Sequence, residues 1–222
     1  ITGVGFADLG NQVTCIDSDS KKLEMLAQNK APFYEPGLSE KMKYNQEAGR
    51  LTFSGSIQDA VEFADILFVA VGTPPDQTGK ANMQYVNDVV DTILSSYMKC
   101  ESPSQKVLVI KSTVPVKTCR HIQEQIHQAG VSSDQLSVVS NPEFLREGTA
   151  LYDFFHPDRI VIGGENRLAI DRLSELYDPL YRKDTPIMTT TWETSELSKY
   201  ASNVFLTAKV SFINEMAQLS EA

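Results

Sequence analysis

The chain has 222 residues, 41% of them hydrophobic, which is enough to bury a sizeable core in one large domain or in one domain with an appendage. Its 20 Lys and Arg stand against 29 Asp and Glu, a net charge of -9, and this acidic balance argues against nucleic acid as a partner. No stretch approaches the roughly 18 consecutive apolar residues of a membrane span, and no basic segment typical of a signal peptide opens the chain. The three cysteines have neither disulfide nor metal-ligand spacing, so we expect no metal site and a cytoplasmic protein.

The first residues, "ITGVGFADLG", contain Gly3 and Gly5 but do not meet the requirements of a dinucleotide-binding loop. Such a loop follows a strand, carries a third glycine three positions after the second and has an acidic residue about 20 residues further on. No strand fits before Gly3, position 8 is Asp8, and Asp17 comes too soon. We therefore expect the phosphate-binding loop to lie upstream of Ile1, and this segment to belong to the helix that follows such a loop.

Short apolar runs then alternate with amphipathic segments. In chain order, the pattern predicts a strand at 12–16, a helix at 20–30 capped by Asp19, a polar helix after the prolines of 31–37, and strands at 51–55 and 66–72 around a helix at 57–65. A helix at 82–98, a strand at 106–113, a helix at 118–130 closed by Gly130, strands at 136–142 and 158–164, and a helix at 167–181 follow. This alternation is typical of an α/β fold with a doubly wound, mostly parallel sheet.

The last segment, from 192 to the end, runs for about 30 residues without Pro or Gly. It predicts a helix longer than the usual helix of a globular protein. Such a helix is typical of a connecting spine between two domains.

Ligands of doubly wound sheets bind beyond the carboxyl ends of the strands. Four polar or Pro- and Gly-rich segments follow predicted strands here: Asp17, "VGTPPD" (71–76), "KSTVP" (111–115) and "SNPEFLREG" (140–148). We expect all four to converge on one rim of the sheet.

Asp17 ends the second strand of a βαβ unit, where a carboxylate can accept hydrogen bonds from both hydroxyls of a ribose. Its charge would repel a 2′-phosphate, which favours NAD over NADP, although an ordinary turn Asp explains the position equally well. The segment 72–75, Gly-Thr-Pro-Pro, forms a rigid turn that lets the backbone approach a ligand, or a turn with no further role. Ser112 and Thr113 contact a ligand or simply cap the next helix.

In "SNPEFLREG", Glu143 and Glu147 bracket Phe144, Leu145 and Arg146. A solvated loop has no reason to hold two large apolar side chains between charges. A binding loop does, because the apolar pair packs inward while carboxylates and backbone groups face a ligand. Carboxyl groups beside apolar side chains are also suited to acid–base chemistry.

Lys199 and Asn203 are four residues apart on the last predicted helix and so share a face, with Tyr200, Val204 and Phe205 around them. Donors in apolar surroundings can stabilise an alkoxide or a carboxylate. The alternative is an interfacial lysine with its ammonium group in water.

Six segments, "APFYEPGL", "ADILFVAVGTPPD", "KSTVPV", "SNPEFLREGTA", "HPDRIVIG" and "ELSKYASNVFLTAKVSFINE", together resemble the UDP-glucose 6-dehydrogenase family in wording and in order. The resemblance covers essentially the whole chain. The wider group includes GDP-mannose dehydrogenases, which share "NPEFLRE", whereas "EGTA" with "HPDRIVIG" is more similar to the UDP-glucose branch.

The resemblance implies an NAD-dependent oxidoreductase that converts the C6 alcohol of UDP-glucose into the carboxylate of UDP-glucuronate by two successive hydride transfers. A cysteine thiohemiacetal and a thioester connect the two oxidations. It also implies a Rossmann-like NAD-binding domain over residues 1–190, incomplete at its start, and the beginning of a central dimerisation helix over 191–222. The expected partners are a nucleotide-sugar substrate and a second copy in a homodimer or higher homo-oligomer, with neither nucleic acid nor membrane.

Residue roles follow from the same resemblance. The cofactor residues it implies are Asp17 at the adenosine ribose, Lys22 beside it, Val71, Gly72, Thr73, Pro74 and Pro75 along the cleft, Ser112, Thr113 and Val114 on the nicotinamide side, and Glu147. The catalytic residues are Glu143 as acid and base of thioester hydrolysis, Thr113 for a water, and Lys199 and Asn203 for the oxyanion. The substrate residues are Glu143, Phe144, Leu145, Arg146, Glu147, Lys199 and Asn203.

The sequence departs from the family pattern in two places. The nucleophilic cysteine of the family is expected in a "GGSCFPKD"-like segment that this sequence does not contain, and Cys15, Cys100 and Cys119 lack its flanking residues. Lys117 stands where the family usually has Gly. The interpretation we favour is a piece of a complete dehydrogenase that is inactive by itself. The alternative is a non-catalytic remnant that binds weakly or pairs through its long helix.

The two interpretations predict different masses for the natural protein. For a piece of a complete dehydrogenase, we expect the intact mass of the protein isolated from its host to be well above that of these 222 residues. A mass equal to that of this chain would support the remnant.

Overall fold

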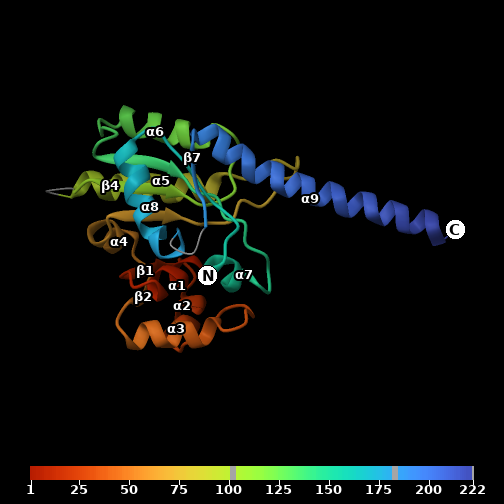
Figure 1. Ribbon diagram of the computed structural model, residues 1–222. Coiled ribbons are helices and arrows are strands. Elements are labelled where there is room, and N and C mark those ends of the chain that lie inside the picture. The colour runs from red at the N-terminus through yellow and green to blue at the C-terminus, as the bar shows by residue number, and fades with distance from the viewer. Residues whose placement is uncertain (101–103, 182–184, 222) are drawn as a thin grey trace.

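The predicted alternation of strands and helices is present in the computed structural model, which describes residues 1–100, 104–181 and 185–221 (Figure 1). The strands are β1 (Val13–Ile16), β2 (Leu51–Ser54), β3 (Ile66–Val69), β4 (Lys106–Ile110), β5 (Leu136–Ser140), β6 (Ile160–Gly163) and β7 (Ile187–Thr190). The helices are α1 (Thr2–Asp8), α2 (Ser20–Ala27), α3 (Leu38–Glu47), α4 (Ile57–Phe63), α5 (Gln84–Lys99), α6 (Thr118–Gln128), α7 (Ala150–Phe155), α8 (Arg167–Tyr181) and α9 (Trp192–Glu221). The α/β class is confirmed; α7 and β7 were not predicted.

The strands form two sheets. β1 pairs in parallel with β2, and a second sheet has the order β3-β4-β5-β6-β7. Within it, β3, β4 and β5 are parallel to one another and β6 is parallel to β7. β5 and β6 meet antiparallel through the single pair Ser140 and Gly163. The prediction of a mostly parallel sheet is therefore confirmed, with one antiparallel step.

The larger sheet is covered on both faces, as its strand sequences require. In β4, Leu108 and Ile110 point into a core shared with α5 and α6, whereas Val107 and Val109 point into a core shared with α1, α7 and α8. This alternation follows from the two-residue period of a strand. Since both faces are apolar, residues 107–110 of the strand form an uninterrupted apolar run, as is typical of parallel sheets buried on both sides.

The first helix confirms the interpretation of the opening glycines. α1 spans Thr2–Asp8, and Gly3 and Gly5 lie where a side chain would collide, with the Cys15 thiol at Gly3 and with the Phe154 ring at Gly5. The ring of Phe6, directly after Gly5, lies 5.3 Å from the Phe154 ring, centroid to centroid. These glycines therefore allow α1 to approach β1 and α7 closely.

The predicted long helix is also confirmed. The first turns of α9 are buried at Trp192, Ser195, Glu196 and Lys199. Beyond them the helix extends away from the sheets, with the C-terminus at its far end (Figure 1). Over residues 1–100, 104–181 and 185–221, no helix combines the length and the apolar composition that crossing a membrane requires.

The packing of Gly5 against Phe154 gives a stability prediction. Gly5→Ala should lower the free energy of unfolding by about 1–3 kcal/mol, because the new methyl group meets an aromatic ring that is itself packed. Urea denaturation measures the change, with Gly55→Ala as the control, since a methyl group there has only ordinary contacts. Equal stability of the two variants would contradict the close packing of α1 on α7.

Candidate active site

The segments that follow β3 and β4 are joined by side chain-to-backbone hydrogen bonds. Ser112 Oγ donates to the Val71 carbonyl at 2.7 Å, and Thr73 Oγ1 donates to the Thr113 carbonyl at 2.8 Å. Ser112 and Thr113 therefore do not cap α6, which begins later, at Thr118. Instead, the turn 71–75 and the segment 111–115 form one surface at the carboxyl end of the sheet.

The N-terminus of α6 is capped from α9. The Lys117 and Cys119 amides donate to the Glu196 carboxylate at 2.6 and 2.7 Å. Glu196 is buried, and this burial raises the pKa of its carboxyl group. Lys117 has a φ of 80°, a left-handed conformation that suits glycine, which explains why Lys is unusual there. This contact fixes the first turns of α9 on the sheet.

One turn after Glu196, α9 brings Lys199 to the loop that follows β5. Lys199 Nζ lies 3.1 Å from Glu143 Oε1, and it lies 5.4 Å from the centre of the Phe144 ring. The Arg159 guanidinium approaches the same ring to 4.5 Å. Lys199 is only 7% exposed, so its ammonium group is not held in water.

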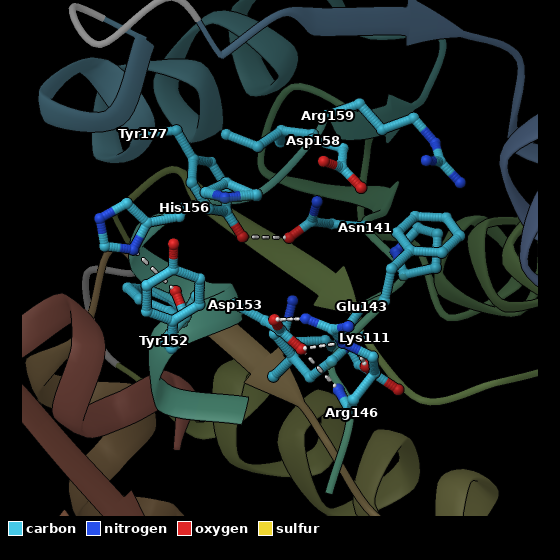
Figure 2. Close-up of a pocket in the computed structure, with 16 residues that line it drawn as sticks. Lys111, Asn141, Glu143, Arg146, Tyr152, Asp153, His156, Asp158, Arg159 and Tyr177 are labelled. Carbon is cyan, nitrogen blue, oxygen red and sulfur yellow. Dashed lines mark hydrogen bonds and ion pairs between the residues drawn. The ribbon is translucent and has the colours of Figure 1, made fainter. Parts of the chain in front are cut away.

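A cavity of about 460 Å³ lies beside this loop (Figure 2). It is enclosed by the segment 141–146, by α7, by the segment 156–160 and by one side chain of α8, Tyr177. On its wall, the Tyr177 hydroxyl donates to Asn141 Oδ1 at 2.6 Å and Asn141 Nδ2 donates to the Val161 carbonyl at 2.9 Å. The start of the loop is thus anchored to β6 and α8.

Lys111 also lines this cavity, and sequence reasoning did not single it out. It is buried, and no hydrogen bond or ion pair of its ammonium group is present in the described part of the chain. Burial lowers its pKa to about 8; the Lys199 charge adds to this effect and Glu143 opposes it. The signal was available, because Lys111 continues the buried face of Val107 and Val109 at the two-residue period of a strand.

The middle of the loop is held by α7. Asp153 accepts hydrogen bonds from the Arg146 amide at 2.9 Å, from its Nε at 3.0 Å and from a terminal guanidinium nitrogen at 2.6 Å. Hydrogen bonding to Arg146 holds the pKa of Asp153 below its ordinary value. The Arg146 side chain is therefore engaged with the protein, whereas Glu147 next to it is exposed.

The remaining predicted residues lie apart from this cluster. Asp17 follows β1, in the smaller sheet; it accepts a hydrogen bond from the Asp19 amide at 2.9 Å and pairs with Lys22 at 3.5 Å. Over the residues that the structure describes, no hydrogen bond or ion pair joins Asp17 to the other three strand-end segments. Asn203 is exposed on α9, one turn beyond Lys199.

The environments of the cysteines differ from that of a reactive thiol. Burial raises the pKa of Cys15 in β1, and it raises the pKa of Cys119 in α6 well above the ordinary value. Thiolate formation is disfavoured at both. Cys100 is the C-cap residue of α5, and its thiol donates a hydrogen bond to the Ser96 carbonyl at 3.4 Å.

A mostly parallel α/β fold whose strands are followed by an acidic residue, Asp17, by the turn 71–75 and by the loop 143–148 has the architecture of a dinucleotide-binding domain. Sequence comparison gives the particular family. Residues 1–181 match the NAD binding domain of the UDP-glucose/GDP-mannose dehydrogenase family, and residues 193–222 match the central domain of the same family. The chain belongs to the UDP-glucose/GDP-mannose dehydrogenase family.

Individual relatives agree with this assignment. The whole chain is 43% identical to a UDP-glucose 6-dehydrogenase of Rhizobium meliloti (strain 1021), of which it covers 50%, and 42% identical to one of Bacillus subtilis (strain 168), of which it covers 48%. Among solved structures, 96% of the chain aligns with 49% of a GDP-mannose dehydrogenase from Pseudomonas aeruginosa, with a TM-score of 0.90 and 33% identity. A UDP-glucose dehydrogenase from Pyrobaculum islandicum aligns over 97% of this chain and 49% of that chain, with a TM-score of 0.89 and 40% identity. The chain thus spans about half the length of these relatives.

The Lys111 environment predicts how stability depends on pH. The pKa of Lys111 is lower in the folded chain than in the unfolded chain. Burial of its charged form therefore lowers the free energy of unfolding below about pH 8. This destabilisation disappears as the pH rises from about 8 towards the ordinary lysine pKa, because the buried ammonium group loses its proton. Lys111→Met should therefore be more stable than the wild type at pH 7, by up to about 3 kcal/mol, with the difference shrinking above pH 8. Urea denaturation from pH 7 to 10 measures it. Lys209→Met, on the exposed part of α9, is the control. If the difference in unfolding free energy between Lys111→Met and the wild type stays constant across this pH range, the prediction is contradicted.

Proposed function

We propose that this chain is the NAD-binding part of an enzyme that oxidises the C6 alcohol of UDP-glucose to the carboxylate of UDP-glucuronate. Residues 1–190 would form the NAD-binding domain, and residues 191–222 would begin the central helix. The observation that carries the proposal is the contact of Lys199 with Glu143 at 3.1 Å, because it joins a buried cation to a carboxylate in the loop that the resemblance assigns to the sugar nucleotide. The names of the relatives that are 40–43% identical favour UDP-glucose over GDP-mannose.

The chemistry of the Lys199–Glu143 pair suits alcohol oxidation. A preorganised ammonium group in a site that excludes water stabilises negative charge on the oxygen of the reacting carbon. The Glu143 side chain is 32% exposed, so its carboxylate is accessible for proton transfer to or from substrate or water. In this proposal, Thr113 orients a water, and Asn203 assists Lys199 at the outer end of the site. The backbone and side chains of 143–147 hold the substrate.

The residues at the strand ends fit NAD. The Asp17 carboxylate is about one-third exposed and is paired with an exposed lysine, Lys22, so it remains available to the hydroxyl groups of a ribose. Gly72 presents exposed backbone without a side chain, between the anchored residues Val71 and Thr73. When bound, NAD supplies the two-electron oxidant. Ser112 and Glu147 complete the proposed set.

We also propose that the nucleophile of the second oxidation lies outside these residues and that the chain alone is inactive. The raised thiol pKa values of Cys15 and Cys119 support this. Homo-oligomerisation through α9 belongs to the same proposal, and the exposed apolar side chains Phe205, Phe212 and Met216 support it. Three free thiols agree with a cytoplasmic location.

The test is NADH formation by the protein expressed from its complete gene, with UDP-glucose or GDP-mannose as substrate. We expect UDP-glucose to support NADH formation, and Lys199→Ala and Glu143→Gln each to lower kcat by about 10²–10³-fold, because both groups act on developing charge or protons. Lys43→Ala, which removes an exposed lysine of α3 that pairs with Glu47, is the matched control and should retain full activity.

The other outcomes separate the alternatives. NADH formation with GDP-mannose and none with UDP-glucose would replace the substrate while keeping the site. No NADH formation with either nucleotide sugar would favour the non-catalytic remnant. Full activity of Lys199→Ala would contradict the role of the Lys199–Glu143 pair.

A further inference from the structure

Glu35 is a buried carboxylate that the proposed mechanism does not use. It lies between α2 and α3, is 8% exposed, and follows Tyr34, which is 88% exposed. In the described part of the chain, no ion pair joins it to a Lys, Arg or His side chain. A buried carboxylate without a cation is costly unless hydrogen bonds satisfy its oxygens, so its partners indicate what it stabilises.

Those partners are the backbone amides that lead into α7. Glu35 Oε2 accepts a hydrogen bond from the Gly148 amide at 3.1 Å, and Oε1 accepts one from the Leu151 amide at 3.0 Å. Both carboxylate oxygens are thus used, at the N-terminus of a helix, where negative charge is favoured. Gly148 has a φ of 82°, so the chain turns sharply at this point.

Glu35 is itself held firmly. It precedes Pro36, which restricts its backbone to an extended conformation. The Leu38 amide donates to the Glu35 carbonyl at 3.2 Å, and Leu38 is buried against α1. The carboxylate is therefore presented from a rigid turn rather than from a free loop.

The position of Glu35 completes the anchoring of the loop 143–148. Lys199 contacts the loop at Glu143, and Asp153 holds it at Arg146. Glu35 holds the far end of the loop at Gly148. The Glu147 side chain, one residue earlier, makes no hydrogen bond in the described residues. α7 has only six residues, too few to be stable by itself, so its position depends on such tertiary contacts.

We propose that Glu35 is a positioning residue for the substrate loop: by accepting the amide hydrogens of Gly148 and Leu151, it sets the backbone 143–148 so that Glu143 meets Lys199. The expected effect on kcat/KM rests on the proposed function, whereas the expected effect on the position of the loop does not. Glu35 does not touch the substrate and acts through the loop.

The test compares Glu35→Gln, Glu35→Asp and Glu40→Gln in the protein expressed from its complete gene. Glu35→Gln keeps one oxygen acceptor and turns its NH₂ group towards one of the two backbone amides, of Gly148 or of Leu151. We therefore expect kcat/KM for UDP-glucose to fall by about tenfold or more, because small displacements of reacting groups lower the rate by that much. The KM for NAD should not change. Glu35→Asp, which keeps both oxygens on a shorter side chain, should recover part of the loss. Glu40→Gln, exposed and close in sequence, should match the wild type.

A second measurement separates this inference from the proposed function. Amide hydrogen exchange of the segment 144–151 should speed up about tenfold or more in Glu35→Gln and not in Glu40→Gln, because the protecting acceptor is lost. If the wild type shows no dehydrogenase activity, the proposed function fails, and exchange alone decides whether Glu35 holds the loop. Unchanged exchange in Glu35→Gln would overturn the inference. A lowered Tm with unchanged kcat/KM would also overturn it, because it would mean a purely structural role.

Discussion

An ion pair between a buried lysine and a partly exposed glutamate joins two distant parts of this chain: the Lys199 ammonium of α9 and the Glu143 carboxylate after β5 lie 3.1 Å apart. Taking an ammonium group out of water is expensive, and attraction to a nearby carboxylate offsets that expense only when the geometry is fixed in advance. Glu196 fixes this geometry, since it caps α6 from α9 one turn before Lys199. The start of α9 therefore packs against the sheet and carries Lys199 to the loop after β5.

Several further charged side chains lie near the Lys199–Glu143 pair or near the loop that carries Glu143. Lys111 lies buried beneath the loop, with its pKa lowered to about 8, and Glu35 is buried with only amide partners. Arg159 faces the Phe144 ring from another element. Buried ionic groups of this kind rarely increase stability, and strongly perturbed groups concentrate at functional sites. The loop 143–148 is therefore the part of the described chain around which buried charged groups gather.

Sequence patterns predicted most of the fold because they are local. The apolar run of β4 and the amphipathic pattern of α8 extend over enough residues for their period to be recognised, and Asp19 caps α2 as its position suggests. α7 was not predicted, since six residues give little periodic signal and its position depends on tertiary contacts, such as the packing of Phe154 on Phe6 and the hydrogen bond from the Leu151 amide to Glu35. β7 is four residues long and only partly buried, so its pairing with β6 rather than its composition defines it.

For the site, the sequence by itself determined which residue types stand at the strand ends, and the amino-acid sequences of six segments indicated the family. Tertiary structure decided which of them meet. It placed Lys199 on Glu143 while leaving Asn203 exposed, engaged Arg146 with Asp153, and brought Lys111 and Glu35 to a loop that neither adjoins in sequence. The physical reason is that a helical or strand pattern is a property of neighbouring residues. A hydrogen bond between Glu35 and Gly148 exists only after the elements that carry them have packed.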